Sequence, residues 1–319
     1  MLSGLALSTV AALMVAGVLL DLLLGEARRW HPLVGFGNWA NWLERRLNRG
    51  GARRARGVLA WLLAVAPPAA LALLLTCSNL AFWISCVAHA ALLYLCLGLR
   101  SLRDHNLPIA AALARADLAG ARQLTARIVS RDTASSNENA LARASTESLL
   151  ENGNDAVFAT LFWFAVGGAP GAVLFRATNT LDAMWGYRSV RFSHFGWAAA
   201  RLDDVFNLLP ARLTALSYVL LARGLHAKRR AWRCWRLQAP QWSSPNAGPV
   251  MASGAGALGI ELGGAAIYDG ELEQRPRLGM GVAARGADIA RAWQLVMRTT
   301  ILWLLAALGA AALVGSMHA

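Results

Sequence analysis

Residues 57–99 read GVLAWLLAVAPPAALALLLTCSNLAFWISCVAHAALLYLCLGL, and this stretch decides the fold class because it contains no Lys, Arg, Asp or Glu. It holds two apolar runs, Gly57–Leu75 and Leu80–Leu99, and each is long enough to cross a bilayer core of about 30 Å as a helix. Only Thr76–Asn79 lie between the runs, so we expect a tight transmembrane hairpin. Two adjacent prolines predict a kink in the first helix, which membrane helices tolerate better than soluble ones do.

The composition extends this interpretation to the whole chain. Of the 319 residues, 56% are hydrophobic and 15% are charged, a balance typical of membrane proteins. By length, Leu2–Leu24 and Thr299–Met317 are further spans. We do not expect the first to be a signal peptide, because it lacks a basic start and carries Asp21 near its end. The sequence therefore predicts an all-α polytopic integral membrane protein with about four transmembrane helices, forming a single membrane-embedded domain over residues 1–319.

Two further segments allow more than one interpretation. Ala156–Phe175 is long enough to span, but Gly167–Gly171 interrupts it, which favours a re-entrant hairpin. The uninterrupted apolar run in Val205–Ala222 is short, which favours an interfacial or buried amphipathic helix. We expect residues 156–222 to form a re-entrant or interfacial region that contributes to the active site.

Basic residues set the predicted topology. The formal net charge is +13, and arginines concentrate in residues 25–56 and 223–298. The positive-inside rule places these two loops in the cytoplasm, together with residues 100–155, and puts both chain termini outside. Anionic lipid headgroups attract such arginines. Nucleic acid is a poor partner, because the chain has no zinc-ligand spacing and no recognisable binding module.

Three carboxylates repeat at a spacing of four residues. Glu147, Glu151 and Asp155 would share one face of a helix and repel one another unless a cation lay between them. Unpaired charge next to apolar membrane sequence is costly, so we expect a divalent metal or an amine at this face. The alternative is that they are ordinary solvated acids at a helix start. Asp203 and Asp204 form a second acidic pair.

The only nucleotide-like motif is weak. Gly254–Gly259 match GxGxxG, but no predicted strand precedes them, so we do not expect a dinucleotide-binding fold. Ser244–Gly248 instead predict a turn before a helix, whose backbone N–H groups could bind phosphate. Ser244 and Asn246 are the candidate contacts, and close packing of the small residues that follow is the alternative reading.

Six polar cassettes occur in a fixed order along the chain: DLLLGEARRWHPLVGFG (21–37), VSRDT (129–133), ESLLENGND (147–155), RATNTLDAMWGY (176–187), FGWAAARLDDVFNLLPARLT (195–214) and SSPNAGPVMASGAGALGIELGG (243–264). Together they cover nearly the whole chain, and in this order they resemble the adenosylcobinamide-phosphate synthase family of cobalamin biosynthesis, a family of integral membrane enzymes. The chain departs from the family pattern at Ala27, where proline is usual.

The resemblance implies ATP-dependent formation of an amide bond. The carboxyl group would come from adenosylcobyric acid, and the amine from 1-aminopropan-2-ol phosphate or ethanolamine phosphate. ATP would activate the carboxylate as an acyl phosphate, with an acyl adenylate as the alternative. The family context also implies Mg²⁺, a location in the bacterial inner membrane and an active site facing the cytoplasm. A homo-oligomer is left open.

Such a reaction needs magnesium held by carboxylates, phosphate-binding groups and a proton acceptor. Metal binding falls to the two acidic groups already described. The candidates for binding substrate or its phosphate groups, beside Ser244 and Asn246, are Arg131, Arg176, Asn179, Arg201 and Arg212. These arginines could instead extend to lipid headgroups. The candidate catalytic residues are Asp132, Asp182 and His31, of which Asp132 could equally cap a turn.

Two other classes of function fit parts of the sequence. A transporter for an anionic metabolite would also have an intramembrane acid, broken helices and clustered arginines. A non-catalytic membrane sensor on a related scaffold is the other alternative, and it would be expected to have lost the acidic cassettes, which are intact here. Amine-dependent consumption of ATP separates the enzyme from the transporter.

Overall fold

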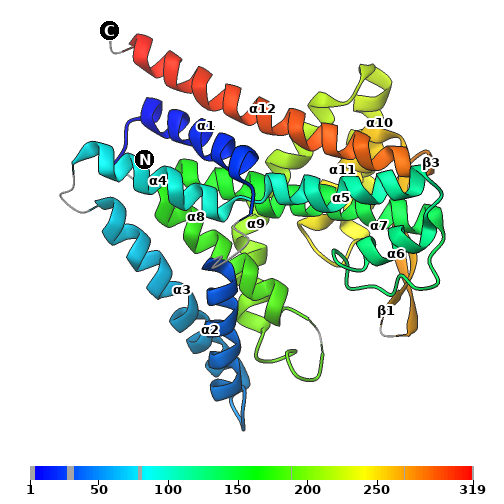
Figure 1. Ribbon diagram of the computed structural model, residues 1–319, viewed down its shortest axis with the longest axis horizontal. Helices are drawn as coiled ribbons and strands as arrows, with labels where there is room; N and C mark the ends of the chain where they lie inside the picture. Colours follow the sequence, from blue (N-terminus) through cyan, green and yellow to red (C-terminus); the bar gives the residue numbers. More distant parts are fainter. Residues whose placement is uncertain (1–3, 27–31, 78–80, 188, 269, 318–319) are drawn as a thin grey trace. The chain divides into compact units, whose positions relative to one another are not determined.

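A computed structural model describes residues 4–26, 32–77, 81–187, 189–268 and 270–317 (Figure 1). Contacts within the chain divide it into two compact units, each built from separate stretches of sequence. Unit 1 comprises residues 1–98, 159–207 and 304–319, and unit 2 comprises residues 99–158 and 208–303. The sequence alone gave no sign of this division.

Unit 1 is a bundle of apolar helices. Its elements are α1 (Leu7–Leu24), α2 (Pro32–Leu47), α3 (Arg53–Cys77), α4 (Phe82–Cys96), α8 (Ala159–Trp185), residues 197–207 of α9 (Trp197–Leu221) and the end of α12 (Gly286–Met317). Helix α8 contacts α1, α2, α3 and α4. The core between α2, α3, α8 and α9 is rich in alanine, including Ala40, Ala60, Ala64 and Ala177. Small side chains let helix backbones approach closely.

The expected hairpin is present as α3 and α4, which contact each other, and both expected prolines lie inside α3. The expected Gly/Pro interruption is also present. Gly168 in α8 has φ 64° and ψ −155°, a conformation open only to glycine. The bend is sharp enough that a Cβ on Gly171 would lie 2.4 Å from the carbonyl oxygen of Trp163.

The break in α8 leaves a backbone N–H without its helical acceptor, and a side chain supplies one. Nδ1 of His89 on α4 accepts a hydrogen bond of 3.0 Å from the N–H of Ala169. His89 is buried, at 2% exposure, and its ring packs edge-on against Phe164. A buried donor without a partner costs stability, so His89 has a defined structural role at the bend.

Unit 2 combines helices with a small sheet. The helices are α5 (Leu99–Ala114), α6 (Leu118–Thr125), α7 (Glu138–Gly153), a π-helix η1 (Asn154–Phe158), residues 208–221 of α9, α10 (Gly224–Gln238), a 3₁₀ turn η2 (Ala239–Gln241), α11 (Ala247–Leu258) and the first part of α12. The strands are β1 (Ile260–Tyr268), β2 (Glu271–Gly279) and β3 (Val282–Ala283), in the order β2-β1-β3. Strand β1 pairs antiparallel with β2 and parallel with β3. The sequence analysis did not predict this sheet.

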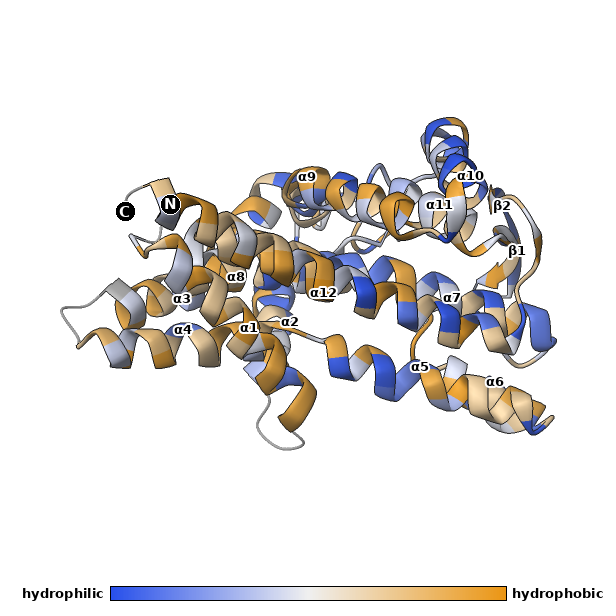
Figure 2. Cartoon of the chain, turned by 90° about the horizontal axis from the view of Figure 1, so that it is seen from above, coloured by the Kyte–Doolittle hydropathy of each residue, from blue (hydrophilic) through white to orange (hydrophobic). Residues whose placement is uncertain are grey.

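Within the described residues, six helices are long and apolar enough to cross a membrane: Leu7–Leu24, Arg53–Thr76, Phe82–Ala114, Glu138–Trp185, Trp197–Leu221 and Gly286–Met317. Apolar residues cover α1, α3 and α4, and polar residues collect on α10 (Figure 2). Large side chains such as Leu74, Trp83 and Leu305 are at least 60% exposed, as expected for surfaces that face lipid. The all-α polytopic class is therefore confirmed, with the small sheet added. The two segments of uncertain type both lie in helices of spanning length.

Candidate functional site

A buried carboxylate organises the centre of unit 2. Glu147, on α7, is 3% exposed. Its Oε2 accepts hydrogen bonds from Nη2 of Arg131 and, at 3.2 Å, from Nη1 of Arg275 on β2. Its Oε1 accepts the N–H of Gly263 at 2.7 Å and Nη2 of Arg275 at 3.3 Å. Each arginine side chain is only 10% exposed, so the group is a nearly dry Arg–Glu–Arg cluster with net positive charge.

A β-bulge at two glycines allows the backbone of the sheet to bind Glu147. The register of β1 against β2 shifts between Gly263 and Gly264, and both have a φ above 70°, which favours glycine. A Cβ on Gly263 would lie 2.0 Å from the carbonyl oxygen of Pro276. The bulge turns the Gly263 N–H to Glu147 and thereby ties the sheet to α7.

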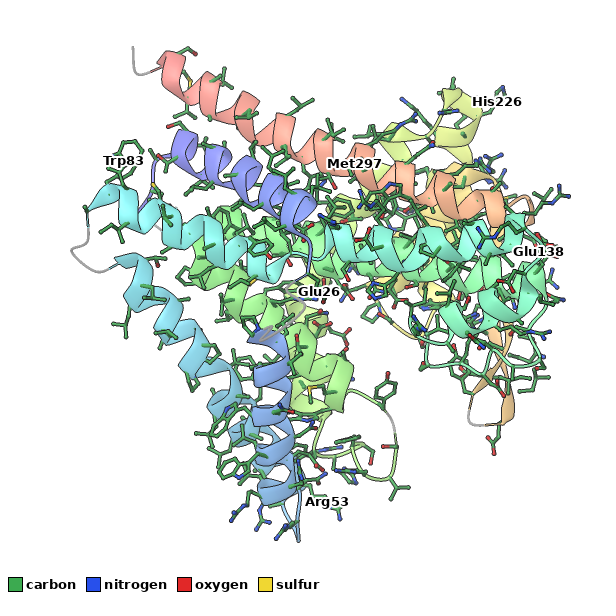
Figure 3. All side chains as sticks on the ribbon, in the orientation of Figure 1. Glu26, Arg53, Trp83, Glu138, His226 and Met297 are labelled. Carbon is green, nitrogen blue, oxygen red and sulfur yellow. The ribbon has the colours of Figure 1, made fainter. Side chains whose placement is uncertain are left out.

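A cavity of about 420 Å³ opens beside this cluster, between α7 and the strands. Figure 3 shows the side chains of this region, with Glu138 labelled at the start of α7. The cavity is lined by Arg143 from α7, by Arg275 and Arg277 from β2, and by the glycine bulge of β1. Its one lining acid, Glu261, is paired with Arg277 at 3.6 Å. The cavity is therefore positively charged and suited to an anion.

Two guanidinium groups in this region each have an N–H donor without a partner among the described residues: Arg143 in the cavity wall and Arg131 in the Glu147 cluster. Nη2 of Arg143 donates to the carbonyl oxygen of Ala265 at 2.8 Å. The Nε atoms of Arg143 and Arg131 are buried and have no hydrogen-bond partner within the part of the chain that is described. Buried donors are usually satisfied, so these two are unusual. Arg143 lines the cavity, so its guanidinium group is the one placed to meet a ligand there. Arginine presents its N–H groups in a geometry that matches phosphate oxygens.

Sequence reasoning selected Arg131 and Glu147 but missed Arg143, Arg275 and Arg277. Arg143 stands one turn before Glu147 on the same helix, and this i, i+4 spacing was a signal that could have identified it. Nothing in the sequence pointed to the two arginines of β2, because the strand itself was not predicted.

The other carboxylates of the acidic stripe lie on the same helical segment. Glu151 and Asp155 are half-buried, and Asp155 follows the change from α-helix to π-helix at Asn154. Asn154 donates to Oδ1 of Asp155 at 2.9 Å and accepts from Thr214 at 2.9 Å. The side chain of Glu151 has neither a hydrogen bond nor an ion pair to any described residue.

The three acids that the sequence analysis grouped as metal ligands differ in their contacts. Both oxygens of Glu147 are occupied by arginines and a backbone N–H. Across the described ranges there is no group of three or more His, Cys, Asp or Glu side chains arranged to hold a metal. Magnesium commonly binds through only one or two carboxylates plus substrate phosphates and water. Glu151 and Asp155 could supply that number, and their metal role stays a prediction.

Unit 1 contains a second polar network, made by two of the sequence cassettes. Nη1 of Arg176 donates to Asn179 Oδ1 at 3.1 Å, and Asn179 Nδ2 donates to Asp203 Oδ1 at 3.2 Å. Asn207 Nδ2 donates to Asp203 Oδ2 at 3.0 Å. Asp203 is 8% exposed, so three predicted site residues meet in a buried chain of hydrogen bonds. The other predicted residues that these cassettes contribute to unit 1 are the half-buried Asp182 and Asp204 and the exposed Arg201.

The predicted turn before α11 is present in unit 2, but its N–H groups are already used. Oγ of Ser244 accepts the N–H groups of Asn246 at 3.3 Å and Ala247 at 3.1 Å, so Ser244 caps the start of the helix. Arg212 donates to Oδ1 of Asn246. The turn that the sequence predicted for Ser244 and Asn246 is thus joined by Arg212, which the sequence analysis did not place there, and the backbone donors expected to face phosphate bond to Ser244.

Two predicted catalytic residues have different outcomes. Asp132 is exposed, its N–H donates to the carbonyl oxygen of Ile267 at 2.9 Å, and its Oδ1 accepts the N–H of Ala134 at 2.8 Å. This is the turn-capping arrangement that the sequence left open as the alternative. His31 lies outside the described residues.

The comparisons with known proteins agree on one family. The family model described as "CobD/Cbib protein" matches residues 14–296. The chain belongs to the CobD/Cbib family. A relative named cobalamin biosynthesis protein CobD from Stutzerimonas stutzeri is 58% identical over 293 residues, covering 91% of this chain and 94% of that protein. A relative of the same name from Chromobacterium violaceum is 54% identical over 310 residues, covering 95% and 97%. No solved structure matches the chain.

Membership confirms the resemblance of the six cassettes and places the chain in a family of cobalamin biosynthesis. The family match also extends across both units, because residues 14–296 include most of unit 1 and nearly all of unit 2. The arginine-lined cavity, the Glu147 cluster and the Asp203 network therefore all lie within the matched region.

Proposed function

We propose that this protein joins the carboxyl group of adenosylcobyric acid to the amine of 1-aminopropan-2-ol phosphate, or of ethanolamine phosphate, at the expense of ATP. Membership of a cobalamin-biosynthesis family supports the corrinoid substrate. The observation that carries the reaction type is the positively charged cavity beside Glu147, where Arg143 has a guanidinium donor without a partner among the described residues. Both ATP and the amino alcohol phosphate present the dianionic oxygens that such donors bind.

The volume of the cavity limits which substrate it can bind. A volume of about 420 Å³ lies at the lower end of the range for small-molecule sites, roughly 300–1,000 Å³. A corrinoid is far too large for it, so the cavity takes a phosphate-bearing co-substrate. Glu147 does not touch that substrate in the proposal. It fixes the geometry of Arg275 in the cavity wall, so that this guanidinium group meets the phosphate without rearrangement.

In the proposed reaction, a carboxylate oxygen of the corrinoid attacks the γ-phosphorus of ATP, which gives an acyl phosphate and ADP. The amine then attacks the acyl carbon, loses a proton and expels phosphate as the amide forms. The alternative is attack at the α-phosphorus, which gives an acyl adenylate and pyrophosphate. Magnesium would neutralise phosphate charge, held by Glu151 and Asp155, with Asp203 and Asp204 as the second predicted pair. Asp132 and Asp182 are the predicted proton acceptors, and in the structure Asp132 caps a turn.

The location we propose is the bacterial inner membrane, with the active site facing the cytoplasm, where ATP is available. Support comes from the six apolar helices and from the arginine-rich segments 25–56 and 223–298, which the positive-inside rule assigns to the cytoplasm.

The test is ATP turnover by the purified full-length protein in detergent or nanodiscs, with magnesium and adenosylcobyric acid, in the presence and absence of each amine. The proposal expects nucleotide hydrolysis that depends on both the corrinoid and the amine. Release of ADP would identify the acyl phosphate route, and release of AMP the adenylate route. Nucleotide turnover that ignores the amine, or no turnover with any amine, would contradict the proposal, and corrinoid-independent movement of an anion across vesicles would favour a transporter.

A variant of the cavity sharpens this test. Arg143→Gln removes one charge from the cavity wall, and we expect it to raise the KM for one phosphate-bearing substrate by about tenfold or more, since a charged hydrogen bond contributes roughly 1.5–3 kcal/mol. Arg127→Gln, an exposed change of equal charge in unit 2, is the matched control. The substrate whose KM rises identifies the occupant of the cavity.

A further inference from the structure

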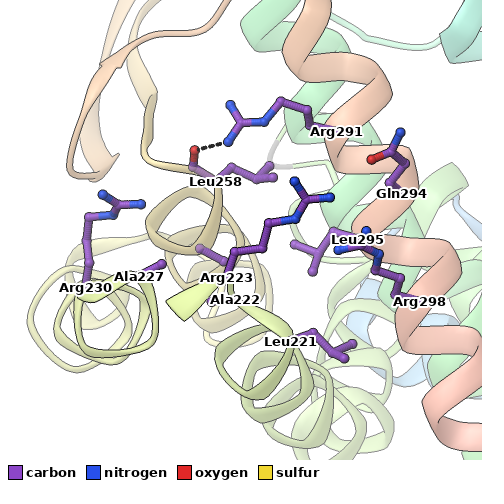
Figure 4. Close-up of a pocket in the computed structure, with 11 residues that line it drawn as sticks. Leu221, Ala222, Arg223, Ala227, Arg230, Leu258, Arg291, Gln294, Leu295 and Arg298 are labelled. Atoms are coloured by element: carbon purple, nitrogen blue, oxygen red, sulfur yellow. Dashed lines mark hydrogen bonds between the residues drawn. The ribbon is translucent and has the colours of Figure 1, made fainter. Parts of the chain in front are cut away.

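A second basic pocket lies in unit 2, away from the Glu147 cavity and unused by the proposed reaction. It has a volume of about 180 Å³ and is formed where the end of α9, the start of α10, the end of α11 and the first half of α12 meet (Figure 4). Four arginines line it: Arg223, Arg230, Arg291 and Arg298. Figure 4 shows their side chains around one opening, together with Gln294.

Two of these arginines bind carbonyl oxygens at the end of α11. Nε of Arg230 donates to the carbonyl oxygen of Gly256 at 2.7 Å, and Nη2 of Arg291 donates to that of Leu258 at 2.6 Å. Both carbonyls belong to the last turn of α11, where carbonyl oxygens have no N–H donor within the helix. The negative end of the helix dipole also favours cations there. Capping of α11 therefore explains why Arg230 and Arg291 converge, and Arg291 is further neutralised by Asp288.

The other two arginines have no such explanation. Among the residues that the structure describes, neither Arg223 nor Arg298 forms a hydrogen bond or an ion pair through its side chain. None of the described residues that line the pocket is acidic. Asp288 offsets the charge of Arg291, and the other three guanidinium groups around this small opening repel one another unless an anion lies between them. The pocket thus has at least two guanidinium groups available to a negatively charged ligand.

The sequence places this pocket at a polar–apolar boundary. Arg223 follows directly on the apolar end of α9, whose candidate span finishes at Leu221. Arg298 directly precedes the apolar run Thr299–Met317 of α12. Both unpaired arginines are therefore next to residues expected at the edge of the hydrocarbon, at the depth of lipid headgroups. The lining between them is apolar, with Leu221, Leu258 and Leu295.

We propose that the pocket formed by Arg223, Arg230, Arg291 and Arg298 binds the phosphate group of an anionic phospholipid. The pocket, at about 180 Å³, is smaller than typical small-molecule sites of roughly 300–1,000 Å³, which suits a phosphate group better than a whole nucleotide. A phosphate accepts hydrogen bonds from the arginines and Gln294, while the lipid's acyl chains follow the apolar ends of α9 and α12. A free phosphate ion would use the same donors but would gain nothing from the adjacent apolar surface.

The test measures binding to the full-length protein, purified in a neutral detergent, by the rise in its unfolding temperature. The probes are phosphatidylglycerol, phosphatidylcholine and inorganic phosphate, each titrated separately. We expect stabilisation that saturates with phosphatidylglycerol, at an affinity at least tenfold greater than with phosphatidylcholine. Equal stabilisation by inorganic phosphate would replace the lipid with a free anion and overturn the assignment.

Variants link the effect to the pocket. Arg223→Gln and Arg298→Gln should each weaken phosphatidylglycerol binding by about tenfold, because each removes charged hydrogen bonds to phosphate, without changing the unfolding temperature in the absence of lipid. Arg229→Gln, an exposed change on α10 that does not line the pocket, is the matched control. If Arg229→Gln weakens binding as much, the effect is general surface charge and the proposal fails. It also fails if neither pocket variant changes the affinity.

Discussion

Replacement of Glu147 by glutamine tests the organisation of the site most sharply. The substitution keeps the shape of the side chain and an oxygen that can accept the N–H of Gly263. It removes the negative charge that Arg131 and Arg275 share. We therefore expect both guanidinium groups to lose their ionic partner while the backbone contact between α7 and the sheet is retained.

The expected magnitude follows from burial. Glu147 is 3% exposed and the two arginine side chains are each 10% exposed, so water cannot replace the lost partner well. Removing one member of a buried ion pair typically costs about 3–5 kcal/mol. Because glutamine keeps one hydrogen bond, we expect a loss of about 3 kcal/mol in the free energy of unfolding of Glu147→Gln.

The assay is chemical denaturation in neutral detergent at pH 7, with Glu138→Gln, an exposed change at the start of the same helix, as the control. The control should unfold like the unaltered protein. Adding Arg131→Gln to Glu147→Gln should cost less than the sum of the two single changes, since only one arginine then lacks a partner. If Glu147→Gln unfolds like the control and loses only its dependence on magnesium, Glu147 is a metal ligand. Its pairing with the two arginines would then not stabilise the fold.

Three further outcomes are expected. Hydrogen bonds from Arg191 hold the pKa of Glu44 below its ordinary value of 4.5, so this carboxylate stabilises the fold above about pH 4.5 and the contribution is lost as the pH falls through the lowered pKa. The deficit in thermal stability of Glu44→Gln should therefore be largest near pH 7 and shrink below about pH 4.5. His89→Leu leaves the N–H of Ala169 without an acceptor and should lower the free energy of unfolding by about 1–3 kcal/mol. Glu151→Gln should unfold like the unaltered protein, because its carboxylate has no described partner, yet lose magnesium-dependent activity.

Each of these has a result that would contradict it. A deficit of Glu44→Gln that is independent of pH would mean that its charge is not what stabilises the fold. Full stability of His89→Leu would mean that the bend in α8 does not depend on the histidine acceptor. Unchanged turnover and magnesium dependence in Glu151→Gln would exclude that side chain as a metal ligand.

The sequence was sufficient for the features that depend on neighbouring residues. The uncharged stretch 57–99 predicted the α3–α4 hairpin, and the run of glycines and a proline predicted the break that is centred on Gly168. Ser244 and Asn246 were correctly placed at the turn before α11. Apolar length, backbone freedom and capping are local properties, so they can be read without the tertiary structure.

The features that the sequence could not provide depend on residues far apart in the chain. The Glu147 oxygens meet an N–H and a guanidinium group that lie 116 and 128 positions later. Strand β2 reads ELEQRPRLG, and its charges and proline argue against a strand when read alone. Because the sheet was not predicted, the sequence analysis could interpret Glu147 only together with the neighbouring acids of its own helix. This led to a metal-ligand prediction, which stays untested, and left the arginine cluster around Glu147 unforeseen.

The mass of the corrinoid product tests the central claim most directly. Purified protein would be incubated with adenosylcobyric acid, ATP, magnesium and 1-aminopropan-2-ol phosphate or ethanolamine phosphate. The account predicts a new corrinoid whose mass equals that of the acid plus the amine less one water, formed by the unaltered protein and the Arg127→Gln control and strongly reduced in Arg143→Gln. A corrinoid of unchanged mass with every amine, or full product formation by Arg143→Gln at limiting substrate, would contradict it.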